Sequence, residues 1–245
     1  MSEVVEGVVV GATDFGEAHR VVRLLSAERG LVSLLARGAR RSKKRFAGML
    51  DVGTRLRAQI RRGRGGLSVF GDVDRLGRPR RAREELERIA LLAYGCELCG
   101  ALAAEDHPAP KLSRLLAVWL ELLEGGDCPG VASLLALEAK ALTFAGVAPS
   151  LVRCAHCGGT LDDPVVVDPS AGGALHGRCG GGRGARVVWL SELERLRRTP
   201  LADTVALPLA NAPPRPSSAS EPLWSCLRAH LGRELRSRAL VQDVL

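Results

Sequence analysis

The feature that most constrains this chain is a change of sequence pattern near Pro79. Before it, short β-branched and leucine-rich runs are separated by glycine-containing turns, a pattern typical of strands. After it, leucine and alanine recur at the three- and four-residue spacing of helices. A stretch rich in glycine and cysteine interrupts the helical part between residues 150 and 187. The pattern therefore predicts an α+β protein with several domains.

The first part of the chain is expected to form a barrel. Its runs predict five strands, over residues 4–10, 21–26, 31–36, 54–61 and 67–73. A glycine-rich junction at 63–66 favours a hairpin between the last two. Five short strands with little else to cover them fit a closed OB-fold barrel, because closure removes exposed strand edges. We therefore expect an N-terminal five-stranded OB-fold barrel over residues 1–79.

The later part is expected to form a helical bundle. Apolar spacing predicts helices over residues 83–104, 110–123, 131–144, 191–198 and 222–241. Ser191 and Glu194 have the spacing of a capping box at the start of the fourth helix. The last helix would carry an apolar stripe of Leu223, Leu227, His230, Leu231 and Leu235, after a proline- and serine-rich loop at 211–218. The expected domains are therefore the barrel (1–79), the helical domain in two parts (80–149 and 188–245) and an insertion (150–187).

Positive charge is concentrated in the first third of the chain. The formal net charge is +8, yet residues 1–80 hold 17 Lys and Arg against 8 Asp and Glu, whereas residues 81–245 hold 18 against 19. A basic surface of this kind is the electrostatic footprint of a nucleic-acid binder, although an ordinary solvated surface is the alternative. Arginine supplies most of the excess, and its planar fork suits phosphate.

The densest cationic segment lies between the third and fourth predicted strands, with six cations in residues 37–45. Such density repels itself unless phosphates or counter-ions neutralise it. The first 80 residues contain only three aromatic side chains, Phe15, Phe46 and Phe70, of which one or two are expected in the core. Binding should therefore be mostly electrostatic and steeply salt-dependent. The candidate DNA-binding residues are Arg37, Arg40, Arg41, Lys43, Lys44, Arg45, Phe46, Arg55, Arg57, Arg61, Arg62 and Arg64.

The insertion carries a candidate metal site. Cys154, Cys157, His176 and Cys179 follow the pattern C-x2-C-x18-H-x2-C, with glycines beside each pair that allow tight turns. Thiolate and imidazole ligands in two close pairs are typical of a structural Zn²⁺ site, which leaves no coordination position for a substrate. The alternatives are a degenerate finger without metal and His156 as a substitute ligand. A second C-x2-C, Cys96 and Cys99, lies within a helical pattern and is expected to be core packing.

Signals for an enzyme or a membrane protein are missing from the sequence. No P-loop, G-x-S-x-G elbow or dinucleotide fingerprint occurs, so we expect a protein that is not an enzyme. A zinc enzyme would need a nearby general base, and no glutamate lies between Cys154 and Cys179. No apolar run reaches the length of a membrane span, and residues 1–7 are acidic and unlike a secretory signal. Seven cysteines, an odd number, favour metal binding or free thiols in the cytoplasm over disulfides.

The order of these parts resembles a known family. A basic strand-rich domain with the loop GARRSKKRF (38–46), a helical domain with an inserted Cys-pair finger, and LGRELRSRAL (231–240) near the C-terminus are similar to the RecO family of bacterial DNA repair and recombination proteins. The resemblance covers nearly the whole chain. It departs from the zinc-bearing members at one point, because those use a second Cys pair where this chain offers His176 with Cys179.

The resemblance implies a non-enzymatic recombination mediator in the cytoplasm, associated with the nucleoid. It implies an OB-fold that binds single- and double-stranded DNA and anneals complementary strands. It also implies work with RecR to help RecA displace the single-strand-binding protein SSB, and a contact of the SSB C-terminal tail with the helical domain. The competing hypothesis is an RNA-binding or ribosome-associated OB-fold protein with a zinc ribbon, since OB-folds bind both nucleic acids.

Overall fold

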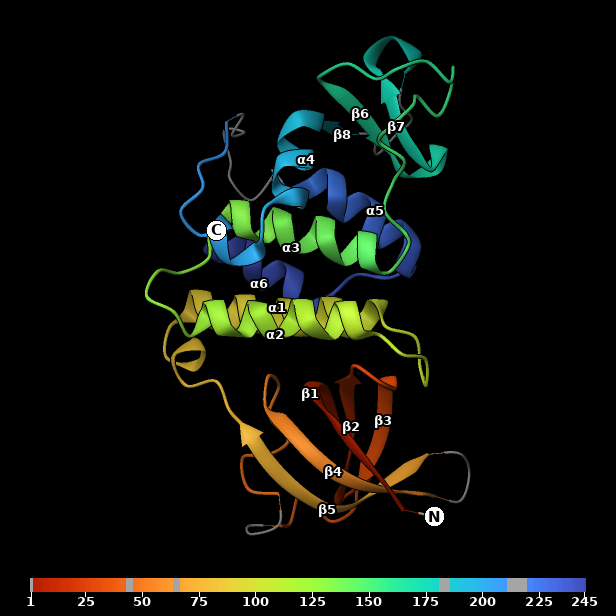
Figure 1. Ribbon diagram of the computed structural model, residues 1–245. Coiled ribbons are helices and arrows are strands. Elements are labelled where there is room, and N and C mark those ends of the chain that lie inside the picture. Colours follow the sequence, from red (N-terminus) through yellow and green to blue (C-terminus); the bar gives the residue numbers. More distant parts are fainter. Residues whose placement is uncertain (1, 43–45, 64–66, 181–185, 211–219) are drawn as a thin grey trace. The chain divides into compact units, whose positions relative to one another are not determined.

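The structure is a computed structural model that describes residues 2–42, 46–63, 67–180, 186–210 and 220–245 (Figure 1). The chain forms two compact units, Met1–Gly125 and Gly126–Leu245. The first therefore contains the strand-rich part together with the first two long helices. The domain boundaries predicted from the sequence remain a prediction. No helix within the described ranges has the length and apolarity to span a membrane.

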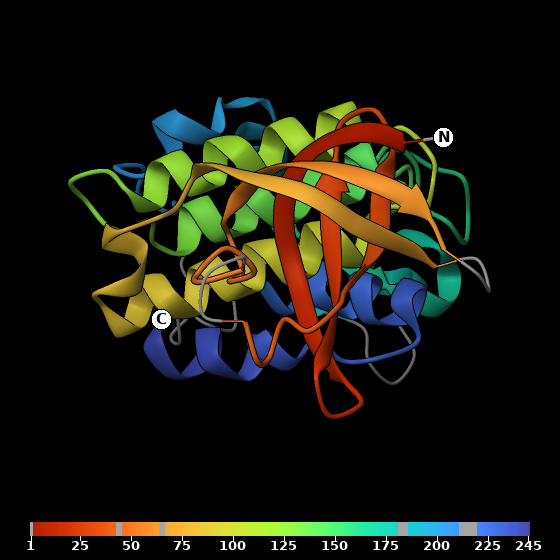
Figure 2. The ribbon, with the colours of Figure 1, turned by 90° about the horizontal axis from the view of Figure 1, so that it is seen from below.

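Five strands of the first unit close into a barrel in the order β1-β2-β3-β5-β4 (Figure 2). They are β1 (Ser2–Phe15), β2 (His19–Ser26), β3 (Gly30–Ala36), β4 (Arg55–Arg62) and β5 (Ser68–Gly77). The first half of β1 pairs with β4 and its second half with β2, and a short parallel pairing of β3 with β5 completes the closure. The predicted five-stranded OB-type barrel is confirmed, with β1 longer than expected.

The barrel core follows from the alternation of buried and exposed side chains along its strands, which β4 shows most regularly. In β4, Leu56, Ala58 and Ile60 are buried, whereas Arg55, Arg57 and Arg61 point to solvent. This two-residue period puts one face of the strand into the core and the other into water. The core also takes residues from β1, β2, β3 and β5, and from the segment that follows β3.

Two helices of the first unit pack beside the barrel: α1 (Leu86–Leu102) and α2 (Pro110–Leu123). They follow the short 3-10 helix η1 (Arg81–Arg83). Trp119 is fully buried, and its indole N–H donates to the Leu91 carbonyl at 3.0 Å. Gly95 leaves room for that indole, because a Cβ there would lie 2.3 Å from Trp119 Cδ1. The predictions of helices over 83–104 and 110–123 are confirmed, with the first starting later.

The second C-x2-C motif is packing, as predicted. Cys96 and Cys99 are fully buried in α1. Burial raises the pKa of Cys96 to about 12 and also raises the pKa of Cys99. These thiols therefore stay protonated and unreactive near neutral pH.

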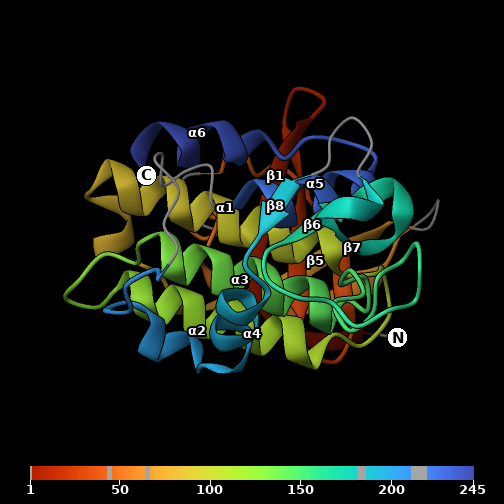
Figure 3. The ribbon, with the colours of Figure 1, turned by 90° about the horizontal axis from the view of Figure 1, so that it is seen from above.

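The second unit combines helices with a small sheet. Its helices are α3 (Val131–Phe144), α4 (Leu190–Arg198), α5 (Glu221–Leu231) and α6 (Arg236–Val244). Its sheet has the order β7-β6-β8, from β6 (Val165–Asp168), β7 (Gly173–His176) and β8 (Arg186–Val188). The helix α5 packs against β6 and β8 (Figure 3). A helical region with an insertion carrying a Cys/His cluster is thus confirmed, although the sequence pattern indicated only the strand at 165–167.

The single helix predicted over 222–241 is wrong. It is split into α5 and α6, because Gly232 adopts the left-handed conformation (φ +63°) and its N–H caps the helix at the Arg228 carbonyl. His230 is consequently exposed, while Leu223, Leu227 and Leu235 are buried. The predicted loop at 211–218 lies outside the described residues.

The predicted capping box at Ser191 is also not formed, because α4 starts at Leu190, two residues earlier than that pattern requires. The first backbone N–H groups of α4 instead donate to a side chain that is distant in sequence. The Asp163 carboxylate accepts from the backbone of Leu190 and, at 3.1 Å, of Ser191. This anion at a helix N-terminus replaces the local cap.

Candidate metal centre and nucleic-acid interface

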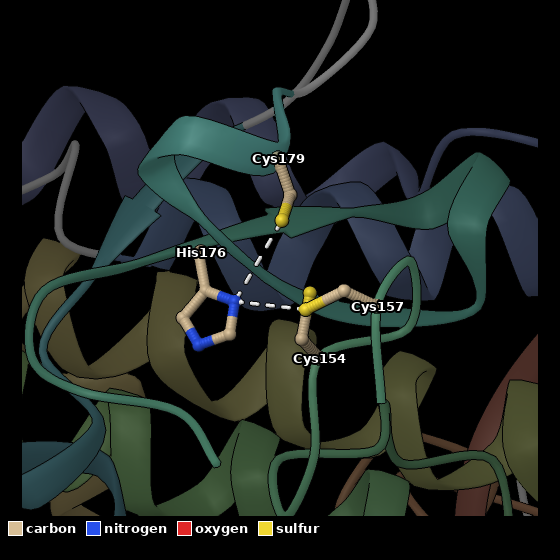
Figure 4. A group of neighbouring side chains, drawn as sticks. All are labelled: Cys154, Cys157, His176 and Cys179. Atoms are coloured by element: carbon tan, nitrogen blue, oxygen red, sulfur yellow. Dashed lines mark hydrogen bonds between the residues drawn. The ribbon is translucent and has the colours of Figure 1, made fainter. Parts of the chain in front are cut away.

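Four side chains of the insertion converge on one point (Figure 4). One ligand atom from each of Cys154, Cys157, His176 and Cys179 lies within 4.8 Å of all the others. His176 Nδ1 is 3.4 Å from Cys157 Sγ and 3.7 Å from Cys179 Sγ. Two ligands of a tetrahedral zinc, one sulfur and one nitrogen, are about 3.6 Å apart. The four residues therefore fit a tetrahedral metal ion.

Backbone turns place the two cysteine-containing pairs opposite each other. In the first, Gly158 has φ +71° and donates to the Cys154 carbonyl, and Ala155 donates to Ala174 of β7 at 2.9 Å. In the second, β7 ends at His176, and a turn through Gly177 and Gly180 (φ +80°) returns Cys179 to the cluster. The predicted role of these glycine turns is confirmed at Gly158 and Gly180.

The orientation of the His176 ring is fixed by a second contact. Its Nε2 lies 2.6 Å from the Thr160 carbonyl oxygen, which can only accept a hydrogen bond. Nε2 therefore carries the proton, and the lone pair of Nδ1 faces the sulfur atoms. This arrangement of an outer carbonyl and an inner ligand nitrogen is the usual support of a metal-bound histidine. His156 is exposed and is not part of the group, so His176 is the ligand that the geometry favours.

The thiols differ in how easily they ionise. Burial acts to raise the pKa of Cys154, but backbone N–H groups of Cys157, His176 and His156 outweigh it and lower the value to about 5. Burial and the neighbouring thiols raise the pKa of Cys179 to about 11. Several thiolates at this spacing repel one another, and a bound cation would remove that penalty. The group is therefore suited to hold a metal ion.

The second feature of the site is a cluster of charged residues at the end of the β1–β2 hairpin, called here the tip cluster. It consists of residues 14–20 from the hairpin and residues 37–42 from the start of the basic loop. The Gly38 N–H donates to His19 Nδ1 at 3.0 Å, and the Arg40 N–H donates to the Ala18 carbonyl at 3.1 Å. The Arg40 side chain also donates to the Gly16 carbonyl at 3.0 Å. These bonds hold the start of the basic loop against the hairpin.

Carboxylates of the hairpin partly balance these arginines. Asp14 lies 2.8 Å from Arg20 Nε and 3.4 Å from Arg40 Nε. Glu17 lies 3.6 Å from Arg41. Both members of each pair are exposed, so each pair contributes about 0–1 kcal/mol and exchanges readily with other ions.

The remaining described candidates lie on the outer face of β4. Arg55, Arg57 and Arg61 are exposed at alternate positions, and Arg57 pairs with Glu6 of β1 at 2.6 Å. Glu6 and the tip residue Phe15 are nine positions apart on β1, about 30 Å along an extended strand. The predicted basic surface therefore consists of two groups, the tip cluster and the outer face of β4.

One candidate residue is corrected. Phe46 has an exposed fraction of 5% and packs edge-to-face on Phe70 in the barrel core, with ring centroids 6.0 Å apart. It is therefore not available to contact DNA. Arg62 lies in β4, and Arg37, Arg40 and Arg41 lie in the tip cluster. Lys43, Lys44, Arg45 and Arg64 lie outside the described residues.

Sequence reasoning missed three residues of the tip cluster: Asp14, Phe15 and Arg20. Phe15 is exposed (54%), in contrast to Phe46 and Phe70. The available signal was the turn Asp14-Phe15-Gly16-Glu17 directly before a strand that begins with a cation. Phe15 is the last residue of β1, paired with His19 beside the turn, and this end position leaves its side chain exposed.

Together, the barrel, the helices and the four-ligand group define a class of protein: an OB-type barrel joined to a helical region with a zinc-finger-like insertion. The comparisons agree with this architecture. Residues 1–76 match the family model for the recombination protein O N terminal, and residues 83–239 match that for the recombination protein O C terminal.

Relatives align over almost the whole chain. The chain is 40% identical to the DNA repair protein RecO of Anaeromyxobacter sp. (strain K), over 97% of this chain and 95% of that protein. It is 36% identical to the DNA repair protein RecO of Myxococcus xanthus, over 95% and 93%. The chain belongs to the RecO family. This membership favours a DNA repair role over the alternative of an RNA-binding or ribosome-associated protein.

Proposed function

We propose that this protein is a non-enzymatic recombination mediator that binds single- and double-stranded DNA through its barrel and anneals complementary strands. With RecR it would help to load RecA onto single strands coated with SSB. The observation that carries the DNA-binding part is the set of exposed arginines in the tip cluster and on the outer face of β4. Membership in the RecO family supports the pathway.

The proposed mechanism is charge neutralisation. Two DNA strands repel each other, and arginines that neutralise phosphates on both would lower that repulsion and raise the local strand concentration. Base pairing would then provide the free energy of annealing. The exposed pairs of Arg40 with Asp14 and of Arg57 with Glu6 would open to phosphate at little cost. The proposal assigns the protein no chemical step on DNA, and it places the protein in the cytoplasm at the nucleoid.

The second unit would serve as the platform for protein partners, including the SSB tail. A zinc ion held by Cys154, Cys157, His176 and Cys179 would have a structural role there. When bound, zinc would cross-link the two turns of a small subdomain whose own core is limited to a few residues such as Leu161, Val165 and Leu175.

The DNA-binding part is tested by removing charge from the basic loop. A variant with Arg40, Arg41, Lys43 and Lys44 replaced by alanine is expected to bind DNA more weakly. Its plot of log affinity against log salt should be flatter, by about 0.9 for each lost contact on duplex. The measurement is a fluorescence-anisotropy titration at several salt concentrations.

The matched control removes the same charge elsewhere. Lys111, Arg114 and Arg228 are exposed on helices, and Arg233 is exposed between α5 and α6; replacing all four with alanine should leave the salt slope unchanged. An unchanged slope in the loop variant, or an equal change in both variants, would reject the basic loop as the phosphate contact.

The pathway is tested by a pull-down with the full-length protein. Purified RecR and SSB should both be retained, and an SSB that lacks its C-terminal tail should be lost. Retention of neither partner would contradict the mediator role while leaving DNA binding intact.

A further inference from the structure

Phe15 is an exposed aromatic side chain for which the fold gives no packing role. It lies at the end of β1, at the turn of the β1–β2 hairpin, and just over half of its surface is accessible. The next residue, Gly16, has φ +60°, and a Cβ placed on it would meet no atom within 4 Å. Phe46 and Phe70 instead pair inside the barrel. The ring of Phe15 therefore faces solvent on a turn that projects from the barrel.

The cations around Phe15 are held in place by the fold. Backbone and ring contacts from Gly38 and Arg40 to the hairpin fix the start of the basic loop beside the turn. Arg20, Arg37, Arg40 and Arg41 lie in this cluster, against the two carboxylates of Asp14 and Glu17. The cluster thus has an excess of arginine around a single exposed ring.

The surroundings of the ring decide what kind of partner it fits. A protein partner would call for a wider apolar patch, whereas the residues beside Phe15 in the chain are Thr13, Asp14, Gly16 and Glu17, all exposed. An unpaired nucleobase needs only one flat face to stack on and cations for the adjoining phosphates. In OB-type barrels the loop between the first two strands is a common place for such contacts.

We propose that Phe15 stacks on an unpaired base of single-stranded DNA whose phosphates lie on the arginines of the tip cluster, and that this contact makes the protein bind single strands more tightly than duplex. Duplex DNA keeps its bases stacked on one another and cannot offer that face. The inference rests on the proposed DNA-binding function and adds to it the residue that distinguishes the two kinds of DNA.

The test compares Phe15→Ala with the intact full-length protein on two probes, a labelled oligothymidylate and a blunt duplex of the same length. The variant is expected to lose about fivefold to about 150-fold in affinity for the single strand, the effect of one base stack. Its affinity for the duplex and its salt slope on both probes should be unchanged. Phe15→Trp keeps an aromatic ring at this position and should bind the single strand as tightly as the intact protein.

Leu240→Ala is the matched control, because Leu240 is an exposed apolar residue (47%) of α6 that belongs to neither group of arginines. It should bind both probes as the intact protein does. Circular dichroism and thermal melting of each variant exclude a loss of fold as the cause of any change.

Each outcome is decisive. Unchanged single-strand affinity in Phe15→Ala, with the intact protein still binding DNA, would overturn the inference and leave the proposed function standing. An equal loss on both probes would also overturn it, because Phe15 would then act through the shape of the hairpin. If the intact protein binds neither probe in a salt-dependent way, the proposed function and the inference both fail.

Discussion

At the scale of single residues, the contact between the Thr160 carbonyl and the His176 imidazole orients a group that could hold a metal ion. The carbonyl fixes the proton on Nε2, so Nδ1 is ready to coordinate. The remaining ligands are thiols, which bind zinc as thiolates and release protons on binding. A bound cation would therefore find the ligand geometry in place and would stabilise the thiolates.

We expect the protein to bind about one zinc ion per chain, and Cys179→Ser to lower its zinc content and thermal stability. The removed thiolate is one of four ligands, and serine is a poor substitute. Cys128→Ser is the control, since Cys128 is also a partly exposed cysteine outside any disulfide but does not belong to the group. Metal analysis after dialysis measures the content. Equal zinc in both variants would contradict the assignment.

A buried ion pair in the second unit gives a second prediction. Glu138 of α3 is fully buried, and its carboxylate lies 3.4 Å from Arg238 of α6. Arg238 also lies 3.5 Å from Glu221 and stacks over Trp224 at 5.4 Å. Arg238→Ala would leave the Glu138 carboxylate without this cation, and we expect it to lower the free energy of unfolding by about 3–5 kcal/mol.

The control for this pair is the double variant Glu138→Gln with Arg238→Met. It removes both charges and keeps the volume of the side chains, so it should be more stable than Arg238→Ala alone. Urea unfolding followed by circular dichroism measures both. A double variant that is less stable than the single variant would show that packing, and not the charge, is what Arg238 contributes.

At the scale of elements, the backbone N–H groups at the starts of two helices donate to carboxylates of residues distant in sequence. The clearest case is η1, whose N-terminal N–H groups of Arg80, Arg81 and Ala82 donate to the Glu124 carboxylate at 3.0, 3.3 and 2.9 Å. Glu124 directly follows α2. One carboxylate thus joins the end of α2 to the segment between the barrel and α1.

This cap makes the stability of the first unit depend on pH. Burial acts to raise the pKa of Glu124, but the three backbone N–H groups outweigh it and lower the pKa. A group with a lowered pKa stabilises the fold above its unfolded pKa, about 4.3 for glutamate, and this stability is lost as pH falls through the folded pKa. We expect Glu124→Gln to be less stable than the intact protein at pH 7 and to show a weaker loss of stability in acid.

The measurement is the urea midpoint of unfolding as a function of pH, from neutral pH downward. The loss of stability should begin near the unfolded pKa of glutamate, about 4.3, and continue below it. Glu121→Gln, an exposed change on the same helix, is the control and should follow the intact protein at every pH. If the curve of Glu124→Gln parallels that of the intact protein, the carboxylate is not the cap that titrates.

The same scale shows what the sequence could predict. Helices such as α2 and α3 were predicted with their observed ends, because proline, glycine and apolar spacing mark them locally. The strand β7 was missed, because four buried residues that include Gly173 have no alternation to reveal them. The cap of α4 was misassigned, because Asp163 is nearly thirty residues from the helix that it caps and only the fold brings them together.

At the scale of the whole molecule, the charge of the sequence indicated a candidate nucleic-acid interface but not its arrangement. The metal ligands could be predicted, since close pairs with glycine turns specify their own geometry. The burial of Phe46 and the exposure of Phe15 could not, because Phe46 lies in an irregular segment and Phe15 ends a strand at a turn, where alternation no longer tells inside from outside. The division of the arginines between the tip cluster and β4 also depends on how the strands close.

If both groups of arginines contact phosphates, removing either should weaken binding independently. We expect Arg55, Arg57 and Arg61 replaced together by glutamine to flatten the salt slope by about 0.7 for each lost contact on single strands and about 0.9 on duplex. Replacing Lys111, Arg114 and Arg228 with glutamine removes the same charge from the helical elements and should leave the slope unchanged. An unchanged slope in the β4 variant would restrict the interface to the tip cluster.

Asp14 is already bound to two arginines of the tip cluster, and this has a consequence for ligand choice. The carboxylate is tethered, so its effective concentration at Arg20 and Arg40 is far above that of a small anion in solution. A free nucleotide or inorganic phosphate would have to displace it alone, with a single weak contact in return. A polymer brings many phosphates at once and replaces Asp14 without difficulty. Because each pair is weak and exchanges readily, Asp14 would shift the balance toward polyanions without excluding small anions.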